Sequence, residues 1–364
     1  MKDYRKVLSE NRSAIMGLMA ILIIVYHAKW ITNNWLFDNT INKFGSIGVD
    51  VFIFVSGFGI AYALTKYDSF EKYYGKRLGR ILPPYYAFEI FNSLLAIVLA
   101  AIGINNNLMQ PLESWLVPVG VWVNQDPHRN LSYKWYISAI LGFYLLAAVI
   151  YPAMKKSKHL YLTTGIFLFI TISFIPYIAE MGNMPFAIQR IPVLIIGLAV
   201  GVASLRKEKE YQKPTLGLIL LTLLCIIGIL MFIFEGKLPG KYLSTLVDPS
   251  NIFIRQALIA PLFTILLAYL FELIKHIKLN RVVKYFAWLG TLSLELYLIH
   301  SIISGIFELT AIPKGIQVLF TVILSIPAAV FLKWLSDKLI MLWRKMSKHI
   351  IAKDNNMKKI GEIK

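Results

Sequence analysis

Apolar runs of close to 20 residues recur along this chain, and they constrain its fold more than any other feature. A helix needs about 20 residues to cross the roughly 30 Å hydrocarbon core of a membrane. Lipid offers no hydrogen-bond partners, so each run must satisfy its backbone groups internally, as a helix does. We therefore predict an all-α, polytopic integral membrane protein with about ten transmembrane helices, over residues 13–34, 46–64, 81–103, 134–153, 160–178, 186–204, 214–234, 253–274, 284–304 and 316–333.

The composition excludes most other classes of protein. Of the 364 residues, 57% are hydrophobic and 16% are charged, against about 45–50% and about 25% in soluble domains. A disordered chain, a fibrous repeat and an ordinary cytosolic enzyme are therefore excluded. The single cysteine, Cys225, excludes a disulfide framework and a cysteine-ligated zinc site. No metal site is predicted.

The net charge of +18 follows the predicted membrane topology. Of the 38 lysines and arginines, 29 lie in alternate loops and at the two ends of the chain. This bias is the positive-inside signal, and it predicts cytosolic N- and C-termini. It accounts for the charge through contact with anionic membrane lipids, without a nucleic-acid partner. We expect one membrane domain over residues 1–333 and a basic cytosolic tail over 334–364.

Two ionisable residues near the predicted outer face are candidates for catalysis. Buried ionisable groups inside membrane spans are costly and often functional. His27 ends the first apolar run, and Asp50 opens the second. An imidazole suits a general base, and a carboxylate bonded to one ring nitrogen would fix its tautomer. The alternatives are a histidine bonded to a neighbouring helix and an aspartate that satisfies a helix N-terminus.

Three arginines near the predicted cytosolic face form a candidate anion site. Arg77 and Arg80 are three residues apart, so they share one face of a helix. Their guanidinium groups suit phosphate oxygens, and Arg12 lies at the same membrane face. Anchoring of the topology by positive charge is the alternative.

A further group of residues is predicted to bind a substrate near the outer face. The alternative for Trp135 and Tyr136 is the aromatic belt at the membrane interface, which does not explain Arg190, Glu295 and His300. The longest outer loop, 104–133, mixes tryptophans with polar residues and is expected to be interfacial or re-entrant.

Taken together and in this order, these stretches resemble acyltransferase family 3, a family of polytopic membrane proteins. The resemblance runs from about Arg12 to Lys333. It rests on the histidine that ends the first apolar run and on five further stretches, GVDVFIFVSGF, KRLGRILPPY, KWYISAI, RIPVLIIG and SLELYLIH.

The resemblance implies an O-acyltransferase of the cell membrane. Acetyl-CoA or another acyl-CoA would be the cytosolic donor, with no permanently bound cofactor, and a hydroxyl of an envelope carbohydrate the acceptor. It implies a catalytic role for His27 and donor binding by Arg77 and Arg80. Many members carry an arginine where this chain has Met16, and Arg12, one helical turn earlier, is taken as its substitute.

The residues leave one alternative function open. A transporter of a glycan or a lipid-linked saccharide could use the buried histidine and aspartate for proton coupling. Transporters often contain paired halves with broken helices, and no such pairing is evident in the sequence. The oligomeric state is not predicted.

Overall fold

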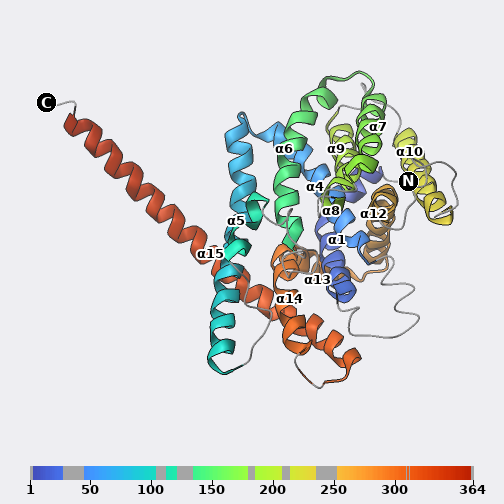
Figure 1. Cartoon of the computed structure of the whole chain (residues 1–364). Helices are drawn as coiled ribbons and strands as arrows, with labels where there is room; N and C mark the ends of the chain where they lie inside the picture. Colours follow the sequence, from blue (N-terminus) through green and yellow to red (C-terminus); the bar gives the residue numbers. More distant parts are fainter. Residues whose placement is uncertain are drawn as a thin grey trace.

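The protein is entirely helical in a computed structural model, which describes residues 3–27, 45–103, 112–120, 134–178, 185–206, 214–234, 252–308, 310 and 312–361. The helices in chain order are α1 (Tyr4–His27), α4 (Ile47–Lys66), α5 (Phe70–Ala101), η2 (Leu112–Val119), α6 (Trp135–Lys156), α7 (Leu160–Ile178), α8 (Pro185–Ile188), α9 (Ile191–Leu205), α10 (Pro214–Ile233), α12 (Ile252–His276), α13 (Asn280–Thr291), α14 (Ser293–Glu308) and α15 (Lys314–Gly361). Figure 1 shows them as a bundle from which the end of α15 projects. The predicted all-α, polytopic membrane fold is confirmed.

The apolar helices are less uniform in length and continuity than the sequence suggested. Seven of the described helices are long and apolar enough to cross a membrane. The predicted span 284–304 is instead a pair of helices, α13 and α14, with a bend of 75° between them. The predicted spans 160–178 and 186–204 contain shorter apolar stretches, over Leu160–Ile175 and Ile191–Leu205. The count of ten spans and the orientation of the termini remain predictions.

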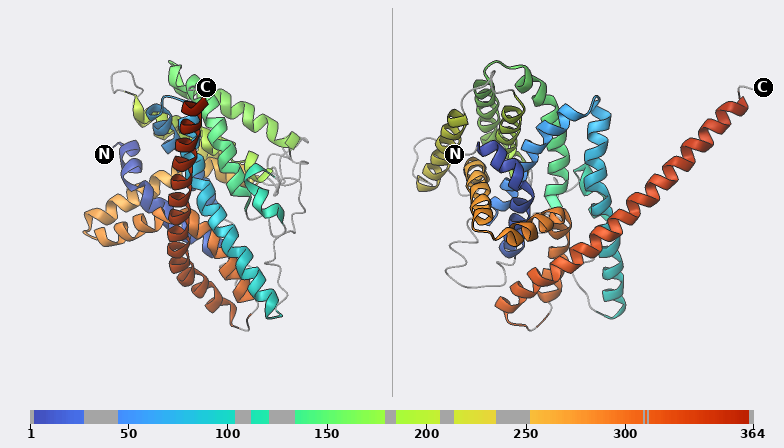
Figure 2. Two further views of the ribbon diagram at one scale, coloured as in Figure 1. Left: turned by 90° about the vertical axis from the view of Figure 1, so that its left-hand side faces the viewer. Right: turned by 180° about the vertical axis from the view of Figure 1, so that it is seen from behind.

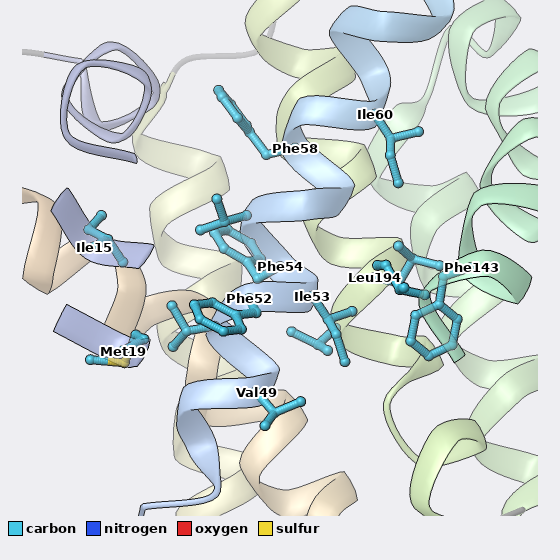
Figure 3. Packing of buried hydrophobic residues seen from close by; sticks show 14 of the residues in the cluster. Ile15, Met19, Val49, Phe52, Ile53, Phe54, Phe58, Ile60, Phe143 and Leu194 are labelled. Atoms are coloured by element: carbon cyan, nitrogen blue, oxygen red, sulfur yellow. The ribbon is translucent and has the colours of Figure 1, made fainter. Parts of the chain in front are cut away.

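Helix α4 lies at the centre of the bundle and is apolar over most of its surface. Its side chains pack against Ile15 and Met19 of α1 and Phe143 of α6, as Figure 3 shows. A helix that is hydrophobic all round belongs in the interior of a bundle. This placement gives the residues of α4 a fixed position between the surrounding helices.

Glycines allow two pairs of helices to approach at backbone contact. A Cβ added to Gly197 of α9 would lie 2.2 Å from the carbonyl oxygen of Phe54, and one added to Gly57 of α4 would lie 2.6 Å from that of Leu194. The crossing of α1 and α13 is equally close, since a Cβ on Gly17 would lie 1.9 Å from the Phe286 oxygen. Small residues permit this packing in membranes, where the gain comes from van der Waals contact.

The outer helices present apolar side chains to their surroundings. Exposed residues on α7 and α10 include Phe169, Phe174 and Leu223, and α15 exposes Phe331 and Trp334. A lipid-facing surface explains this exposure, because acyl chains replace water around it. Helix α15 continues without a break through the predicted domain boundary at residue 333. Its C-terminal half extends beyond the other helices, as Figure 2 shows.

Part of the predicted outer loop 104–133 packs into the bundle. Only residues 112–120 of this loop belong to the described part of the chain, and they form η2. Ser114 and Val117 of η2 are buried, and the Tyr85 hydroxyl donates a hydrogen bond to the Ser114 carbonyl. The described part of the loop is therefore anchored to α5.

Candidate functional site

A cavity of about 740 Å³ lies between α1, α4, α5, α6, α13, α14 and α15. It is called the basic cavity here, because one carboxylate, Glu295, lines it together with six basic residues: Arg12, Lys66, Lys76, Arg77, Arg80 and Lys333. Ligand pockets commonly measure about 300–1,000 Å³, so the basic cavity has the size of a ligand site. Its excess of positive charge suits a ligand with several negative charges.

The basic cavity follows one face of α4 over much of its length. The lining residues of α4 run from Phe52 through Ser56 and Gly59 to Lys66. These 14 steps correspond to about 21 Å along the helix axis. Lys66 at the end of α4 and Lys76 in the second turn of α5 are exposed, and Phe52 at the other end is buried. The basic cavity is therefore elongated, with a charged mouth and a closed inner end.

Gly59 brings two of the arginines close to the backbone of α4. A Cβ at this position would lie 2.6 Å from a terminal nitrogen of Arg12, so a glycine leaves room for that guanidinium. Arg77 donates a hydrogen bond of 3.4 Å to the Gly59 carbonyl. The Arg77 guanidinium also lies over the rings of Tyr73 and Tyr144, 5.6 and 5.2 Å from their centroids. Arg77 is thus held in place by contacts within the protein.

Arg12 and Arg80 are held less tightly. Arg12 lies within electrostatic reach of both Arg80 and Arg77, and like charges so close repel one another. Among the described residues, no ion pair neutralises Arg12 or Arg80. A bound anion would relieve this repulsion and use donors that the protein leaves available.

Three aromatic rings close the inner end of the basic cavity. Phe52 of α4, Tyr136 of α6 and Tyr297 of α14 all line it and are all buried. The ring centroids of Phe52 and Tyr136 are 6.5 Å apart, and those of Tyr136 and Tyr297 are 5.2 Å apart. We call these three residues the aromatic floor.

Two histidines lie on the other side of the aromatic floor. The His27 and His300 rings, here called the histidine pair, have centroids 4.9 Å apart. The Tyr297 ring lies 6.1 Å from that of His300. Neither histidine lines the basic cavity. The rings thus form a continuous series from the cavity to His27.

Backbone carbonyls fix the tautomer of both histidines. Nδ1 of His27 lies 2.9 Å from the Ile23 oxygen, and Nδ1 of His300 lies 3.1 Å from the Leu296 oxygen. A carbonyl oxygen can only accept, so each Nδ1 carries the hydrogen. In a neutral imidazole the proton acceptor is then Nε2.

Asp50 pairs with Arg190 rather than with His27, which corrects the arrangement expected from the sequence. Oδ1 of Asp50 lies 3.2 Å from Nε of Arg190, and both side chains are buried. The Arg190 guanidinium also lies 4.8 Å from the centroid of Trp135. Asp50 lies in the first turn of α4, and the Ile23 carbonyl, which accepts from Nδ1 of His27, fixes the tautomer that Asp50 was expected to fix.

The predicted site residues therefore fall into three neighbouring groups. Five line the basic cavity, and His27 and His300 form the histidine pair; the other three, Asp50, Trp135 and Arg190, form a buried ionic group. Arg190 lies within electrostatic reach of Tyr26, next to His27, and of Tyr297. The ionic group is thus close to the histidines and to the aromatic floor.

Sequence reasoning missed a buried ion pair at the base of η2. Nζ of Lys134 lies 2.6 Å from Oε1 of Glu89, and the Ser114 hydroxyl donates to Oε2 of Glu89 at 2.8 Å. All three side chains are buried. Lys134 opens the predicted span 134–153, and only the isolated carboxylate of Glu89 within an apolar run could have indicated a partner. The pair ties α5, η2 and the start of α6 together.

Comparison with known families accounts for this arrangement. Residues 15–336 match an acyltransferase domain, the domain of acyltransferase family 3. No curated protein and no solved structure matches the chain. The family match covers most of the sequence. It identifies the protein as an enzyme and excludes the alternative of a transporter, which the residues alone did not exclude. The chain therefore belongs to acyltransferase family 3 and is a multi-pass, membrane-bound acyltransferase.

Proposed function

We propose that the basic cavity binds acyl-CoA and that His27 transfers its acyl group to a hydroxyl of a carbohydrate. The observation that carries this proposal is the order of charged, aromatic and histidine side chains along the cavity and beyond it. Six cations line it together with a single carboxylate, and an aromatic floor separates them from His27, whose Nδ1 donates to the Ile23 carbonyl and whose proton acceptor is therefore Nε2. A donor with phosphates at one end and a neutral thioester at the other matches this order.

The distance from the arginines to His27 supports an extended donor. Arg12 and His27 are 15 residues apart on α1, or about 22 Å along the axis. An extended pantetheine arm has a comparable length. Phosphates held by Arg12, Arg77 and Arg80 would direct the arm along α4 toward the aromatic floor. The acyl carbonyl would then approach His27 while the phosphates stay at the arginines beside Gly59.

The reaction is a direct transfer in this proposal. Nε2 of His27 accepts the proton of the acceptor hydroxyl, and the oxygen attacks the thioester carbonyl carbon. A carbon–oxygen bond forms and the carbon–sulfur bond breaks. The departing CoA sulfur takes the proton from His27, so the products are an ester and free CoA. Nδ1 keeps its hydrogen bond to Ile23 throughout.

In the proposed reaction, the donor carries an acetyl group and the acceptor is a glycan of the cell envelope. The acceptor approaches from the end of the bundle opposite the α4–α5 turn, past Trp135 and Arg190, and the protein works in the cell membrane. In cells that carry His27→Ala, the surface glycan would lose its acetyl esters, as an analysis of alkali-released acetate would show.

Donor binding is the direct test of this assignment. We expect Arg12→Gln and Arg80→Gln each to weaken CoA binding about tenfold, since a charge-assisted hydrogen bond contributes about 1.5–3 kcal/mol. Arg80→Lys should recover only part of the affinity, because lysine lacks the planar fork. Titration calorimetry of the purified protein with CoA gives these affinities.

The matched control is Arg281→Gln. Arg281 is exposed on α13 and does not line the basic cavity, so its replacement should leave CoA affinity unchanged. Unchanged affinity in the double variant Arg12→Gln/Arg80→Gln would overturn the assignment of the basic cavity to the donor.

A further inference from the structure

The aromatic floor lies at the end of the basic cavity nearest the histidine pair. On α4, α6 and α14, the lining residues farthest from the mouth are Phe52, Tyr136 and Tyr297. Their exposed fractions are 3%, 7% and 5%. The three rings follow one another in series, so they form a continuous aromatic wall at this end of the basic cavity.

Tyr297 has a particular place among these residues. Its ring contacts Tyr136 on one side and His300 on the other, with centroids 5.2 and 6.1 Å apart. It therefore lies between the cavity and the histidine pair. An acyl carbonyl that approaches His27 from the cavity must pass this ring, and the rest of the acyl chain must fit beside it.

We propose that the aromatic floor restricts the donor to short acyl groups, and that Tyr297 is the residue that sets this limit. This inference rests on the proposed function, because it assumes that the thioester enters through the basic cavity. Closely packed interiors do not accept extra methylenes without displacement of their side chains. A small acyl group passes the ring of Tyr297, whereas a longer chain would have to displace Tyr297, Tyr136 or His300.

The ring of Tyr297 sets the limit through its volume. Replacing Tyr297 by alanine removes the ring that separates the cavity from the histidine pair, and it leaves space for additional methylenes of the acyl chain. Replacing it by phenylalanine keeps the ring and removes only the hydroxyl. The two variants therefore separate the size of the side chain from its hydrogen bonding.

The experiment compares acetyl-, butyryl- and octanoyl-CoA as donors to one carbohydrate acceptor. For the wild-type protein, we expect kcat/KM to fall at least about tenfold from acetyl-CoA to butyryl-CoA. A single methylene that does not fit a pocket lowers kcat/KM by about 10-fold or more. For Tyr297→Ala, the ratio of butyryl to acetyl transfer should rise about tenfold. Tyr297→Phe should keep the wild-type ratio.

Binding of free CoA serves as the control for folding. Tyr297→Ala should still bind CoA, because Arg12, Arg77 and Arg80, which hold the phosphates in the proposed function, are unchanged in this variant. If this variant does not bind CoA, Phe52→Ala opens the same floor from α4 and should raise the ratio instead.

Two results would overturn the inference. One is a wild-type protein that transfers octanoyl groups as readily as acetyl groups. The other is an unchanged butyryl-to-acetyl ratio in a Tyr297→Ala variant that still binds CoA. Failure of the proposed function is distinguishable, because the wild-type protein would then transfer no acyl group of any length from CoA.

Discussion

At the scale of single residues, His27 combines a fixed tautomer with a position beyond the basic cavity. Because it does not line that cavity, its loss should leave donor binding intact. We expect His27→Ala to lower kcat by about 10²-fold or more, as for a general base, with CoA affinity unchanged. Steady-state kinetics together with CoA titration separate the two effects.

A second histidine provides the matched control for this variant. His159 is exposed at the turn between α6 and α7, far along α6 from the aromatic floor. His159→Ala should retain wild-type activity. Full acyl transfer by a folded His27→Ala variant would exclude His27 as the base.

The buried ion pair of Asp50 and Arg190 leads to a prediction about the stability of the protein. Removing one partner of a buried ion pair leaves the other charge buried without that counter-ion, at a cost of about 3–5 kcal/mol. Replacing both partners by apolar residues of similar size often costs much less. We therefore expect Asp50→Ala to lower the thermal midpoint in detergent more than the double variant Asp50→Ala/Arg190→Met does. Equal midpoints for the two would argue against a stabilising pair.

The residue types of the site were predictable from the sequence, but their partners were not. Arg12, Arg77 and Arg80 could be assigned to one face because all three lie near span ends of the same predicted side. Asp50 was assigned to His27 because both lie at similar depth. Depth along a helix does not fix the direction of a side chain, and Arg190, at the start of α9, faces Asp50 instead.

At the scale of helices, the contact between α4 and α9 depends on glycine. We expect Gly197→Ala to destabilise the protein by at least about 1–3 kcal/mol, the usual cost of overpacking, because the new Cβ would lie 2.2 Å from the Phe54 oxygen. Gly165 on α7 is the matched control, since a Cβ there meets no atom within 4 Å. Gly165→Ala should leave the thermal midpoint unchanged or raise it, as alanine favours helix. A tolerated Gly197→Ala would contradict this packing.

The helices were the most predictable part of the fold, because each apolar run of suitable length has one stable conformation in lipid. The bend between α13 and α14 was not predictable in the same way. Hydropathy is continuous across Thr291–Ser293, and the break arises where Gly290 packs against the α1 backbone at Ser13. The aromatic floor was equally hidden, since its three rings come from three helices and only packing brings them together.

At the scale of the whole molecule, the predicted sidedness can be tested through the two ends of α5. The positive-inside bias places Ser69, just before α5, in the cytosol, and Ile102, just after it, outside. Figure 1 shows these ends of α5 on opposite sides of the bundle. After Cys225 is replaced by alanine, Ser69→Cys should react with an impermeant maleimide only from the cytosolic side and Ile102→Cys only from the other. Reversed labelling would invert the orientation.

The same orientation requires donor and acceptor to reach the protein from opposite faces. The basic cavity extends to Lys66 beside the α4–α5 turn, whereas His27 ends α1 about 22 Å from Arg12. In sealed vesicles of one orientation, acyl-CoA supplied only at the α4–α5 face should therefore support acylation of a carbohydrate confined to the other side. A membrane-impermeant acceptor and a mass-spectrometric assay of its ester give the readout, and vesicles that contain His27→Ala provide the background. Acylation that occurs only when both substrates are on the α4–α5 side would contradict this arrangement. The acceptor would then enter the basic cavity from the same side as the donor, and it would not approach His27 from the opposite face.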